Sequence, residues 1–279
     1  MKRVAVIVND TKSGAGELAE EVCLRLKSAG INPVIIMEDR DSPTEGGQIY
    51  SCCEEVIRCE ALIAIGGDGT ILGAARMVLP YDIPVLGINA GRLGFLAGLE
   101  RYEIDKMSRL STGEYTLAHR MLLEVKVHQG KQLLCEQLCI NDAVVSRYAT
   151  SRLMEIPVAC DGHTLNYHGD GVIFSTPTGS TAYGFSAGGP VVDPRLETIT
   201  LTPICNHRLF NRSIMFAPEA QFKAGIPHEG MALTYDGEPP FMLSRGQTVT
   251  VRRAEQSVRF IQLKKQSFLD ILNKKLISK

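Results

Sequence analysis

Residues 61–79 read ALIAIGGDGTILGAARMVL, and this stretch decides the fold. Its first five residues form a continuous apolar run, which is typical of a fully buried strand. Three glycines follow within four positions, and Thr70 is the expected helix N-cap. The next apolar residues recur with helical spacing, at Ile71, Leu72, Ala75, Val78 and Leu79. The stretch therefore predicts a strand, a glycine turn and a helix.

The glycine turn also contains a carboxylate, Asp68. Such a turn aims backbone N–H groups and a helix dipole at one point, which suits a phosphate, and Gly66, Gly67 and Gly69 let a ligand approach closely. A carboxylate there repels phosphate. Asp68 fits if it binds a metal that also holds the phosphate, or if it takes a proton from an attacking hydroxyl. The alternative is a solvated turn residue, because short glycine motifs are common.

A second polar loop begins at Gly169 and reads GDGVIFSTPTGSTAYGFSAGGPVVDP. An apolar strand over residues 172–175 leads into many hydroxyls, at Ser175, Thr176, Thr178, Ser180, Thr181, Tyr183 and Ser186. These are more donors than a turn requires. Two polar, glycine-rich loops that each follow an apolar strand predict one polyphosphate ligand, held from two sides.

Five blocks together resemble the NAD kinases, which phosphorylate the 2′-hydroxyl of the adenosine ribose of NAD to make NADP. They are GGDGT (66–70), GINAGRLGFLAGL (87–99), NDAVV (141–145), the loop block at 169–192, and LTPICNHRL (201–209). GGDGT alone is weak, because lipid kinases and phosphofructokinases carry similar turns. The long loop block is specific, and the resemblance covers most of the chain in the right order.

Composition limits the partners of the 279-residue chain. The net charge is −1 with no large basic block, so we expect no nucleic-acid binding. No apolar run approaches the roughly 20 residues of a membrane-spanning helix, and residues 1–10 read as a first strand rather than a signal peptide. Eight cysteines without a C-x-x-C pair indicate reduced thiols in a cytoplasmic protein, with a zinc site as a minor alternative.

Alternating strands and helices predict an α/β domain over residues 1–114. We expect strands at residues 4–8, 33–37, 61–65 and 83–88, and helices at 17–29 and 49–59, with a mobile loop at 38–48. Leu18, Val22, Leu24 and Leu26 are expected to face inward, and Gly30 to end their helix. Helices on the faces of a parallel sheet follow from this alternation, with ligands at the C-terminal strand ends, where Asp68 lies.

A β-rich domain is predicted over residues 115–261. Alternating runs occupy residues 115–127, 132–147 and 153–160, and later strands are expected at 214–216, 231–235, 248–252 and 258–263. A last helix is predicted at 267–276, and the resemblance implies that residues 262–279 return to the first domain. The basic residues of the tail, Lys274, Lys275 and Lys279, read as a solvated helix end.

The resemblance and the chemistry together make Asp68 the general base that removes the proton of the ribose 2′-hydroxyl. Mg²⁺, or another divalent cation, and the backbone of Gly66, Gly67, Gly69 and Thr70 would neutralise the phosphoryl donor. That donor is ATP or polyphosphate. The identity of any metal ligand stays open.

The nucleotide-binding residues follow from the same resemblance. Asn89 and Phe95 form a wall of the pocket, where Phe95 either stacks on a base or fills the core, and Arg92 meets a phosphate or is solvated. Asn141 and Asp142 read an adenine edge or fix a ribose diol; the family usually has Glu where Asp142 stands, so the contact is longer or passes through water. The remaining candidates are Arg152, His168, Asp170, Thr178, Thr181, Ala182, Tyr183, Gly184, Phe185, Ser186 and Glu238.

Three residues depart from the family pattern. Glu238 replaces Gln, and Asn206 and Arg208 replace Pro and Ser, which puts the local loop shape in doubt. Two other functions remain open. One is a lipid or sugar kinase with the same glycine turn, and the other is a non-catalytic NAD(P)-binding regulator. The family usually forms dimers or tetramers, so a homodimer or homotetramer is expected.

Overall fold

A computed structural model describes residues 1–9, 14–36, 54–91, 94–149, 152–265 and 267–277. The expected loop at 38–48 and Arg92 lie outside these residues. The chain forms two compact units: unit 1 contains residues 1–119 and 258–279, and unit 2 contains residues 120–257. Among the described residues, none of the helices combines the length and the apolar character needed to span a membrane.

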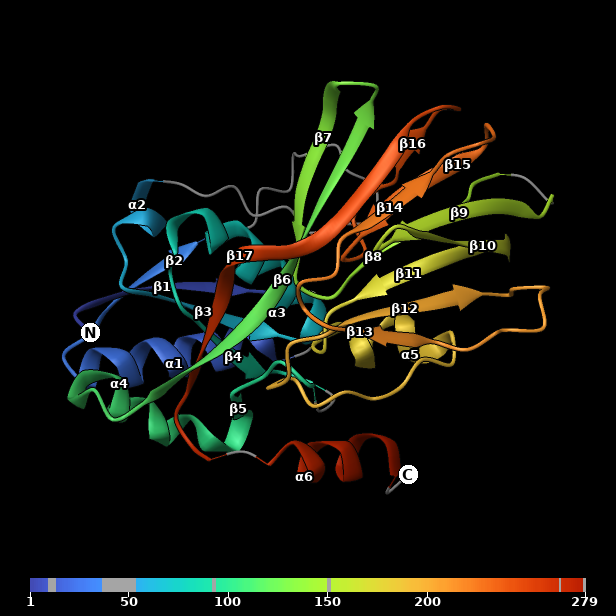
Figure 1. Cartoon of the computed structure of the whole chain (residues 1–279). Helices are drawn as coiled ribbons and strands as arrows, with labels where there is room; N and C mark the ends of the chain where they lie inside the picture. The colour runs from blue at the N-terminus through green and yellow to red at the C-terminus, as the bar shows by residue number, and fades with distance from the viewer. Residues whose placement is uncertain (10–13, 37–53, 92–93, 150–151, 266, 278–279) are drawn as a thin grey trace. The chain divides into compact units, whose positions relative to one another are not determined.

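Unit 1 is built on a parallel sheet (Figure 1). Its strands lie in the order β2-β1-β3-β4, and every neighbouring pair is parallel. Their bounds are β1 Arg3–Val8, β2 Asn32–Ile36, β3 Ala61–Gly66 and β4 Val85–Asn89. The short β5 (Leu99–Glu100) and the end of β17 (Thr248–Gln262) also pair with β4. All residues of β3 are buried, as expected for a strand covered on both faces.

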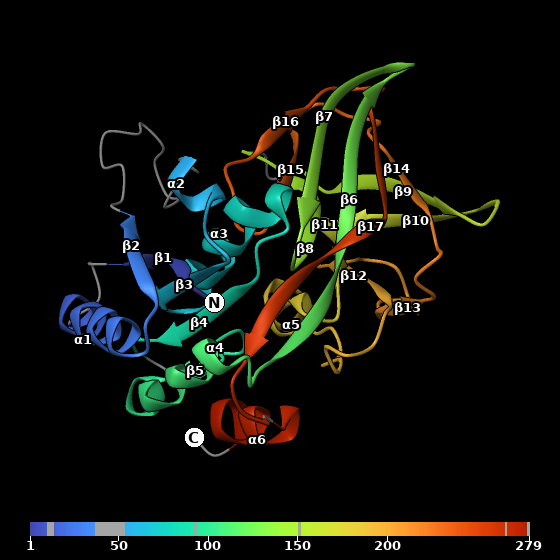
Figure 2. The ribbon, with the colours of Figure 1, turned by 90° about the vertical axis from the view of Figure 1, so that its left-hand side faces the viewer.

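Helices cover both faces of this sheet (Figure 2). On one face, α1 (Ala15–Ser28), η2 (Arg101–Ser108) and α4 (Arg109–Thr112) pack into the cluster that contains Ile63 and Leu86. On the other face, α3 (Asp68–Val78) packs on β3 and β4, and α2 (Glu54–Ile57) lies against β1 and β2. A single 3-10 turn, η1 (Leu79–Tyr81), follows α3.

Two expectations about these helices are wrong in detail. Leu24 is 67 % exposed, because it lies two residues from Val22 and therefore on the opposite side of α1. Thr70 is not the N-cap of α3; Gly67 is, and Thr70 lies inside the first turn. Its hydroxyl accepts a hydrogen bond from Asn9 Nδ2 at 3.1 Å instead. Gly30 follows α1 with φ +75°, as expected for a helix stop.

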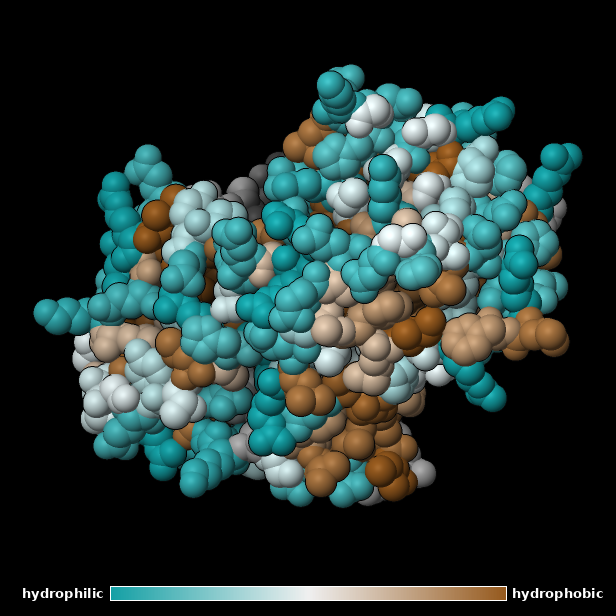
Figure 3. Space-filling view, viewed as in Figure 1, coloured by the Kyte–Doolittle hydropathy of each residue, from teal (hydrophilic) through white to brown (hydrophobic). Residues whose placement is uncertain are grey.

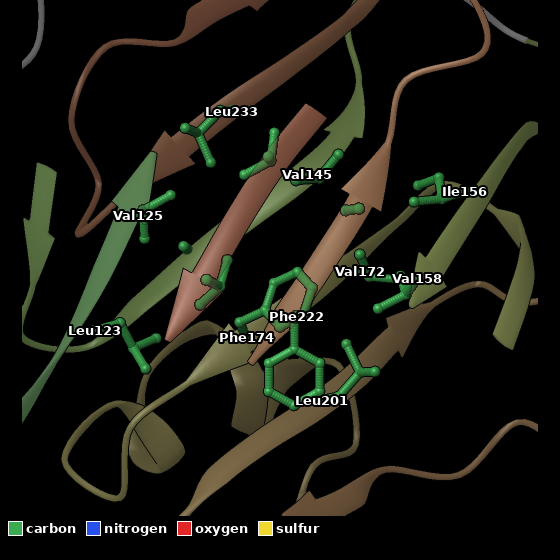
Figure 4. Packing of buried hydrophobic residues seen from close by; sticks show 14 of the residues in the cluster. Leu123, Val125, Val145, Ile156, Val158, Val172, Phe174, Leu201, Phe222 and Leu233 are labelled. Atoms are coloured by element: carbon green, nitrogen blue, oxygen red, sulfur yellow. The ribbon is translucent and has the colours of Figure 1, made fainter. Parts of the chain in front are cut away.

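Unit 2 is a β-sandwich. One sheet has the order β10-β9-β14-β17 with β6 and β7 beyond, and the other has the order β13-β12-β11-β8-β15-β16. Figure 4 shows how side chains from both sheets meet in one core around Phe174 and Phe222, whose ring centroids lie 5.2 Å apart. The α/β unit with a parallel sheet and this β-rich unit confirm the predicted fold class.

The strands of unit 2 are mostly short. Their bounds are β6 Thr116–Gln129, β7 Gln132–Cys139, β8 Asp142–Arg147, β9 Met154–Cys160, β10 His163–Gly169, β11 Gly171–Ser175, β12 Ile199–Ile204, β13 Ile214–Phe216, β14 Phe222–Gly225, β15 Met231–Tyr235 and β16 Phe241–Leu243. Two short helical turns, η3 (Gly179–Thr181) and α5 (Tyr183–Ser186), interrupt the loop after β11.

The expected strands at 248–252 and 258–263 are one strand, β17. Apart from Ala254, the intervening residues 253–257 are polar. They contain no Gly, Pro or Asn to turn the chain, and Ala254 is buried. After β17, Ser267 caps α6 (Phe268–Leu272) by accepting from the N–H of Asp270, and the last turn, η4 (Asn273–Ile277), is a π-helix.

Candidate active site

In unit 1, Asp68 lies at the first position of α3, directly after the glycine turn that ends β3. Its Oδ1 accepts from the N–H of Leu96 at 3.0 Å, and its Oδ2 accepts from the N–H of Phe95 at 2.9 Å. The ammonium of Lys275 donates to Oδ2 at 2.9 Å. Asp68 is therefore a carboxylate held in a fixed orientation by donors from two other segments of the chain.

Two glycines around Asp68 are required by close packing. A Cβ on Gly94 would lie 2.1 Å from Asp68 Oδ1, and a Cβ on Gly66 would lie 2.4 Å from Thr70 Oγ1. By contrast, a Cβ on Gly67 or Gly69 would meet no described atom within 4 Å. Among the described residues, none fills the space beside these two glycines, which is what a phosphate-binding turn needs.

Asn89 and Phe95 lie in the same part of unit 1. The side chain of Asn89 is buried, donates to Glu100 Oε2 at 2.8 Å and accepts from the N–H of Gly91 at 3.0 Å, so it shapes its own loop. Phe95 is half-buried, and the Lys275 ammonium lies 4.1 Å from its ring centroid. One face of the Phe95 ring is therefore occupied by a cation.

In unit 2, Asn141 and Asp142 are held by a residue that the sequence did not single out for this role. The Asp236 carboxylate accepts from the N–H groups of Ile140 at 2.8 Å, Asn141 at 2.7 Å and Asp142 at 3.2 Å. Asp236 and Gly237 both have positive φ, in the turn that joins β15 and β16. The only hint in the sequence is the Asp-Gly pair, which is typical of such a turn.

Asp142 is a buried carboxyl, 5 % exposed. Burial, and then the nearby charge of Asp236, raise its pKa to about 7, although the backbone N–H of Tyr183 donates to it and acts in the opposite direction. Near neutral pH this carboxyl therefore exists in both protonation states, so it can donate as well as accept a hydrogen bond.

The loop after β11 is fastened onto Asn141. The N–H of Thr176 donates to the Asn141 carbonyl at 2.9 Å, and its hydroxyl donates to the Ile140 carbonyl at 2.6 Å. A Cβ on Gly179 would lie 2.0 Å from the Asn141 carbonyl oxygen, so only glycine fits there. The buried Ser180 hydroxyl donates to Pro177 and accepts from the N–H of Val192. These two hydroxyls hold the loop together rather than facing a ligand.

The predicted binding residues of this loop fall into two groups. Thr178 and Gly184 are buried and Thr181 and Ala182 are half-buried, with the Thr181 hydroxyl donating to the Thr178 carbonyl at 3.4 Å. Tyr183, Phe185 and Ser186 are exposed, and Tyr183 as a whole is 47 % exposed. The exposed ring of Tyr183 is thus available to a planar ligand, while its own N–H contacts Asp142.

Asp170 lies between β10 and β11, and His168 lies near the end of β10. Asp170 forms a two-pronged ion pair with Arg147, at 3.1 Å and 3.2 Å. The N–H of His168 donates to Asn206 Oδ1 at 2.9 Å, and the Asn206 amide donates to the Phe210 carbonyl at 2.9 Å. Through these two bonds, Asn206, which replaces the proline usual in the family, attaches its loop to β10. Nothing in the structure explains Arg208.

The last two candidates are Arg152 and Glu238. Arg152 is exposed, two residues before β9. Glu238 is half-buried in the turn after Asp236, and its N–H donates to the Tyr235 carbonyl at 2.9 Å. In unit 2 the structure thus joins Asn141 and Asp142 to Asp236, and Tyr183 to Asp142. In unit 1 it groups Gly94, Phe95 and Lys275 around Asp68.

These features define a class: a phosphotransferase with a nucleotide-type α/β unit, whose glycine turn carries a fixed carboxylate, and a β-sandwich unit. Family comparison agrees. Residues 4–115 match the ATP-NAD kinase N-terminal domain, and residues 140–263 match the ATP-NAD kinase C-terminal domain. The chain belongs to the ATP-NAD kinase family.

Whole-chain relatives support this assignment. An NAD kinase of Natranaerobius thermophilus is 36 % identical over 99 % of this chain and 98 % of its own length. An NAD kinase of Moorella thermoacetica is 38 % identical over 99 % of this chain and 89 % of its own. Among solved structures, yeast NADH kinase complexed with NADH superposes with a TM-score of 0.87 at 26 % identity, covering 100 % of this chain and 88 % of that one. An Archaeoglobus fulgidus NAD kinase in complex with ATP shares the fold, with a TM-score of 0.75 at 23 % identity over 98 % of both chains.

Proposed function

We propose that this chain transfers the γ-phosphoryl group of ATP to the 2′-hydroxyl of the adenosine ribose of NAD, giving NADP and ADP. The curated relatives named NAD kinase support the reaction, and so does the likeness to a yeast enzyme solved with NADH. The observation that carries the proposal is the carboxylate of Asp68, fixed at a helix start beside two glycines whose added Cβ atoms would meet no described atom within 4 Å.

In the proposed reaction, Asp68 accepts the proton of the 2′-hydroxyl as the ribose oxygen attacks the γ-phosphorus. The bond from that phosphorus to the bridging oxygen breaks, and ADP leaves. The proton on Asp68 passes to solvent afterwards. A ribose hydroxyl is a weak acid, so a carboxylate within hydrogen-bond reach lowers the barrier to attack.

The donor is proposed to arrive with Mg²⁺ already on its phosphates. Mg²⁺ in proteins is usually held by one or two carboxylates together with substrate phosphates. In the part of the chain that the structure describes, no three acidic, histidine or cysteine side chains are grouped to hold a metal. When bound, the ion would offset the negative charge of the donor phosphates, and the backbone of Gly67 and Gly69 would lie beside those phosphates.

NAD is proposed to bind unit 2 through Asn141, Asp142 and Tyr183. The carboxyl of Asp142 and the amide of Asn141 suit a ribose diol or an adenine edge, and the exposed Tyr183 ring suits stacking on a base. Polyphosphate as a second donor, a cytoplasmic location and a homodimeric or homotetrameric assembly are further parts of this proposal, and they rest on the family resemblance.

Asp68→Asn tests the reaction. The variant keeps the shape of the side chain but cannot take a proton, so turnover should fall by at least roughly 100-fold, within the range of general-base effects. NADP is measured with a coupled NADP-specific dehydrogenase, and NAD binding by calorimetry should stay within a few-fold of wild type. Asp105→Asn, an exposed carboxylate elsewhere in unit 1, is the matched control.

The outcomes separate the competing functions. Near wild-type turnover in Asp68→Asn would show that the base is another group. A wild-type protein that binds NAD but makes no NADP with ATP or polyphosphate would be the non-catalytic regulator. A protein that fails to bind NAD would point to the lipid or sugar kinases.

A further inference from the structure

Lys275 was expected to be a solvated tail residue, yet it contacts the proposed base. Its Nζ donates to Asp68 Oδ2 at 2.9 Å, across 207 positions of sequence. The same ammonium lies 4.1 Å from the centroid of the Phe95 ring, and the N–H of Phe95 donates to the same oxygen of Asp68. Lys275, Phe95 and Asp68 thus form one three-way contact inside unit 1.

The C-terminal segment, residues 267–277, partly buries a charged residue in addition to the apolar Ile271, which is 9 % exposed. Its charged Lys275 is half-buried, with 27 % of the side chain exposed, while Leu269 and Ile277 are each 65 % exposed. Figure 3 shows hydrophobic side chains, in brown, gathered at the surface in the region where α6 lies in Figure 1. Lysine is rarely buried unless it is paired. The pairing with Asp68 and the Phe95 ring accounts for the partial burial of Lys275.

The helical geometry of the segment also supports a specific role for Lys275. Its last turn, Asn273–Ile277, is a π-helix rather than an α-helix. Such turns are rare and occur frequently at functional sites. Lys274, the neighbour of Lys275, is exposed, so a single lysine of this turn faces inward.

The contact answers a problem that the glycine turn poses. An anionic base beside a polyphosphate is repelled by it, and an ammonium on that base offsets the repulsion. Three donors, from Phe95, Leu96 and Lys275, occupy three of the roughly four acceptor positions of the Asp68 carboxylate. One position on Oδ1 then remains to receive the proton.

We propose that Lys275 is a positioning residue for phosphoryl transfer, which orients the Asp68 carboxylate and neutralises its charge beside the phosphoryl donor. This inference rests on the proposed function. It assigns to the C-terminal turn a part in the chemical step, and none in the binding of NAD.

The test uses Lys275→Met, which keeps the length of the side chain without its charge, in the full-length protein. The kcat should fall by roughly 10- to 100-fold, the scale on which misplacing a catalytic group by about 1 Å acts, with the KM for NAD within about twofold. Lys275→Arg should recover most of the loss, because it restores the cation. Lys274→Met is the matched control and should behave as wild type.

Two results would overturn the proposal. A Lys275→Met variant with wild-type kcat would show that the contact has no catalytic part, and a raised kcat would show that the C-terminal turn restrains Asp68. The wild-type protein is assayed in parallel. If it forms NADP, the proposed function holds, and either result then concerns Lys275 alone.

A second measurement does not depend on activity. Asp68→Asn, Lys275→Met and the double variant form a mutant cycle in urea unfolding. If the shift in urea midpoint of the double variant differs from the sum of the shifts of the two single variants, the ion pair is present in solution. If the shift equals that sum, the ion pair and the proposal are both contradicted.

Discussion

At the scale of single residues, the candidate residues include carboxylates in three different environments, one in unit 1 and two in unit 2. Asp68 is held by two backbone N–H groups and one lysine, Asp236 by three backbone N–H groups, and Asp142 is buried beside Asp236 with its pKa raised. The same chemical group therefore serves as a proposed base, as an anchor for a loop and as a carboxyl that can be protonated near neutral pH.

Tyr183→Ala tests the stacking role of the exposed ring. We expect NAD binding to weaken by about 1–3 kcal/mol, the range of base–aromatic stacking, with little effect on stability, because Tyr183 is 47 % exposed. Calorimetry of NAD binding measures the change, and Tyr102→Ala, an exposed tyrosine of unit 1, serves as the control. An unchanged Kd would remove Tyr183 from the site.

At the scale of elements, the loop after β11 depends on one close contact. The chain can pass over Asn141 only because Gly179 has no side chain, and the Thr176 hydrogen bonds then lock the loop in place. The sequence shows the loop as rich in hydroxyls, but it does not show which hydroxyls face inward.

Gly179→Ala should distort this loop. The added Cβ would meet a backbone carbonyl at 2.0 Å, and overpacking of this kind costs typically about 1–3 kcal/mol. We expect lower stability in urea unfolding, together with weaker NAD binding because Asn141 must shift. Gly16→Ala is the control. Gly16 lies in α1, and its new Cβ would meet no described atom within 4 Å, so this variant should be at least as stable as wild type. Wild-type values for both measurements in Gly179→Ala would show that the loop is not fastened in this way.

At the scale of the whole molecule, buried Asp142 links stability to pH. Its folded-state pKa of about 7 lies above its ordinary value of 3.8. Between these values the folded protein holds a proton that the unfolded chain has released. This contribution to stability is complete below pH of about 4 and is lost as pH rises through about 7.

Asp142→Asn should remove that dependence, since the amide keeps the shape and does not ionise. Relative to wild type, the variant should therefore have a higher free energy of unfolding at pH 8 than at pH 5. Urea unfolding at both pH values measures it. A difference that stays constant with pH would show that Asp142 titrates at its ordinary value.

Much of the fold could be predicted because its signals are local. Continuous apolar runs such as residues 61–65 mark buried parallel strands, Gly30 ends α1, and the Asp-Gly pair at 161–162 forms the turn between β9 and β10 with positive φ at both residues. Two predictions were wrong for local reasons. The mostly polar residues 253–257 suggested a break in β17, although they contain no turn residue. Leu24 was predicted to be buried, although it lies two positions from Val22 and therefore on the other side of α1.

The sequence by itself determined the strand–turn–helix around Asp68, the α/β and β-rich parts of the chain, and the family, because each depends on residues that are close together in the chain. Only the tertiary structure decided which groups hold the site. Lys275 meets Asp68 across 207 positions, and Asp236 meets Asn141 across 95. Such pairings follow from sheet topology and packing, which bring distant segments together, and no spacing along the sequence encodes them.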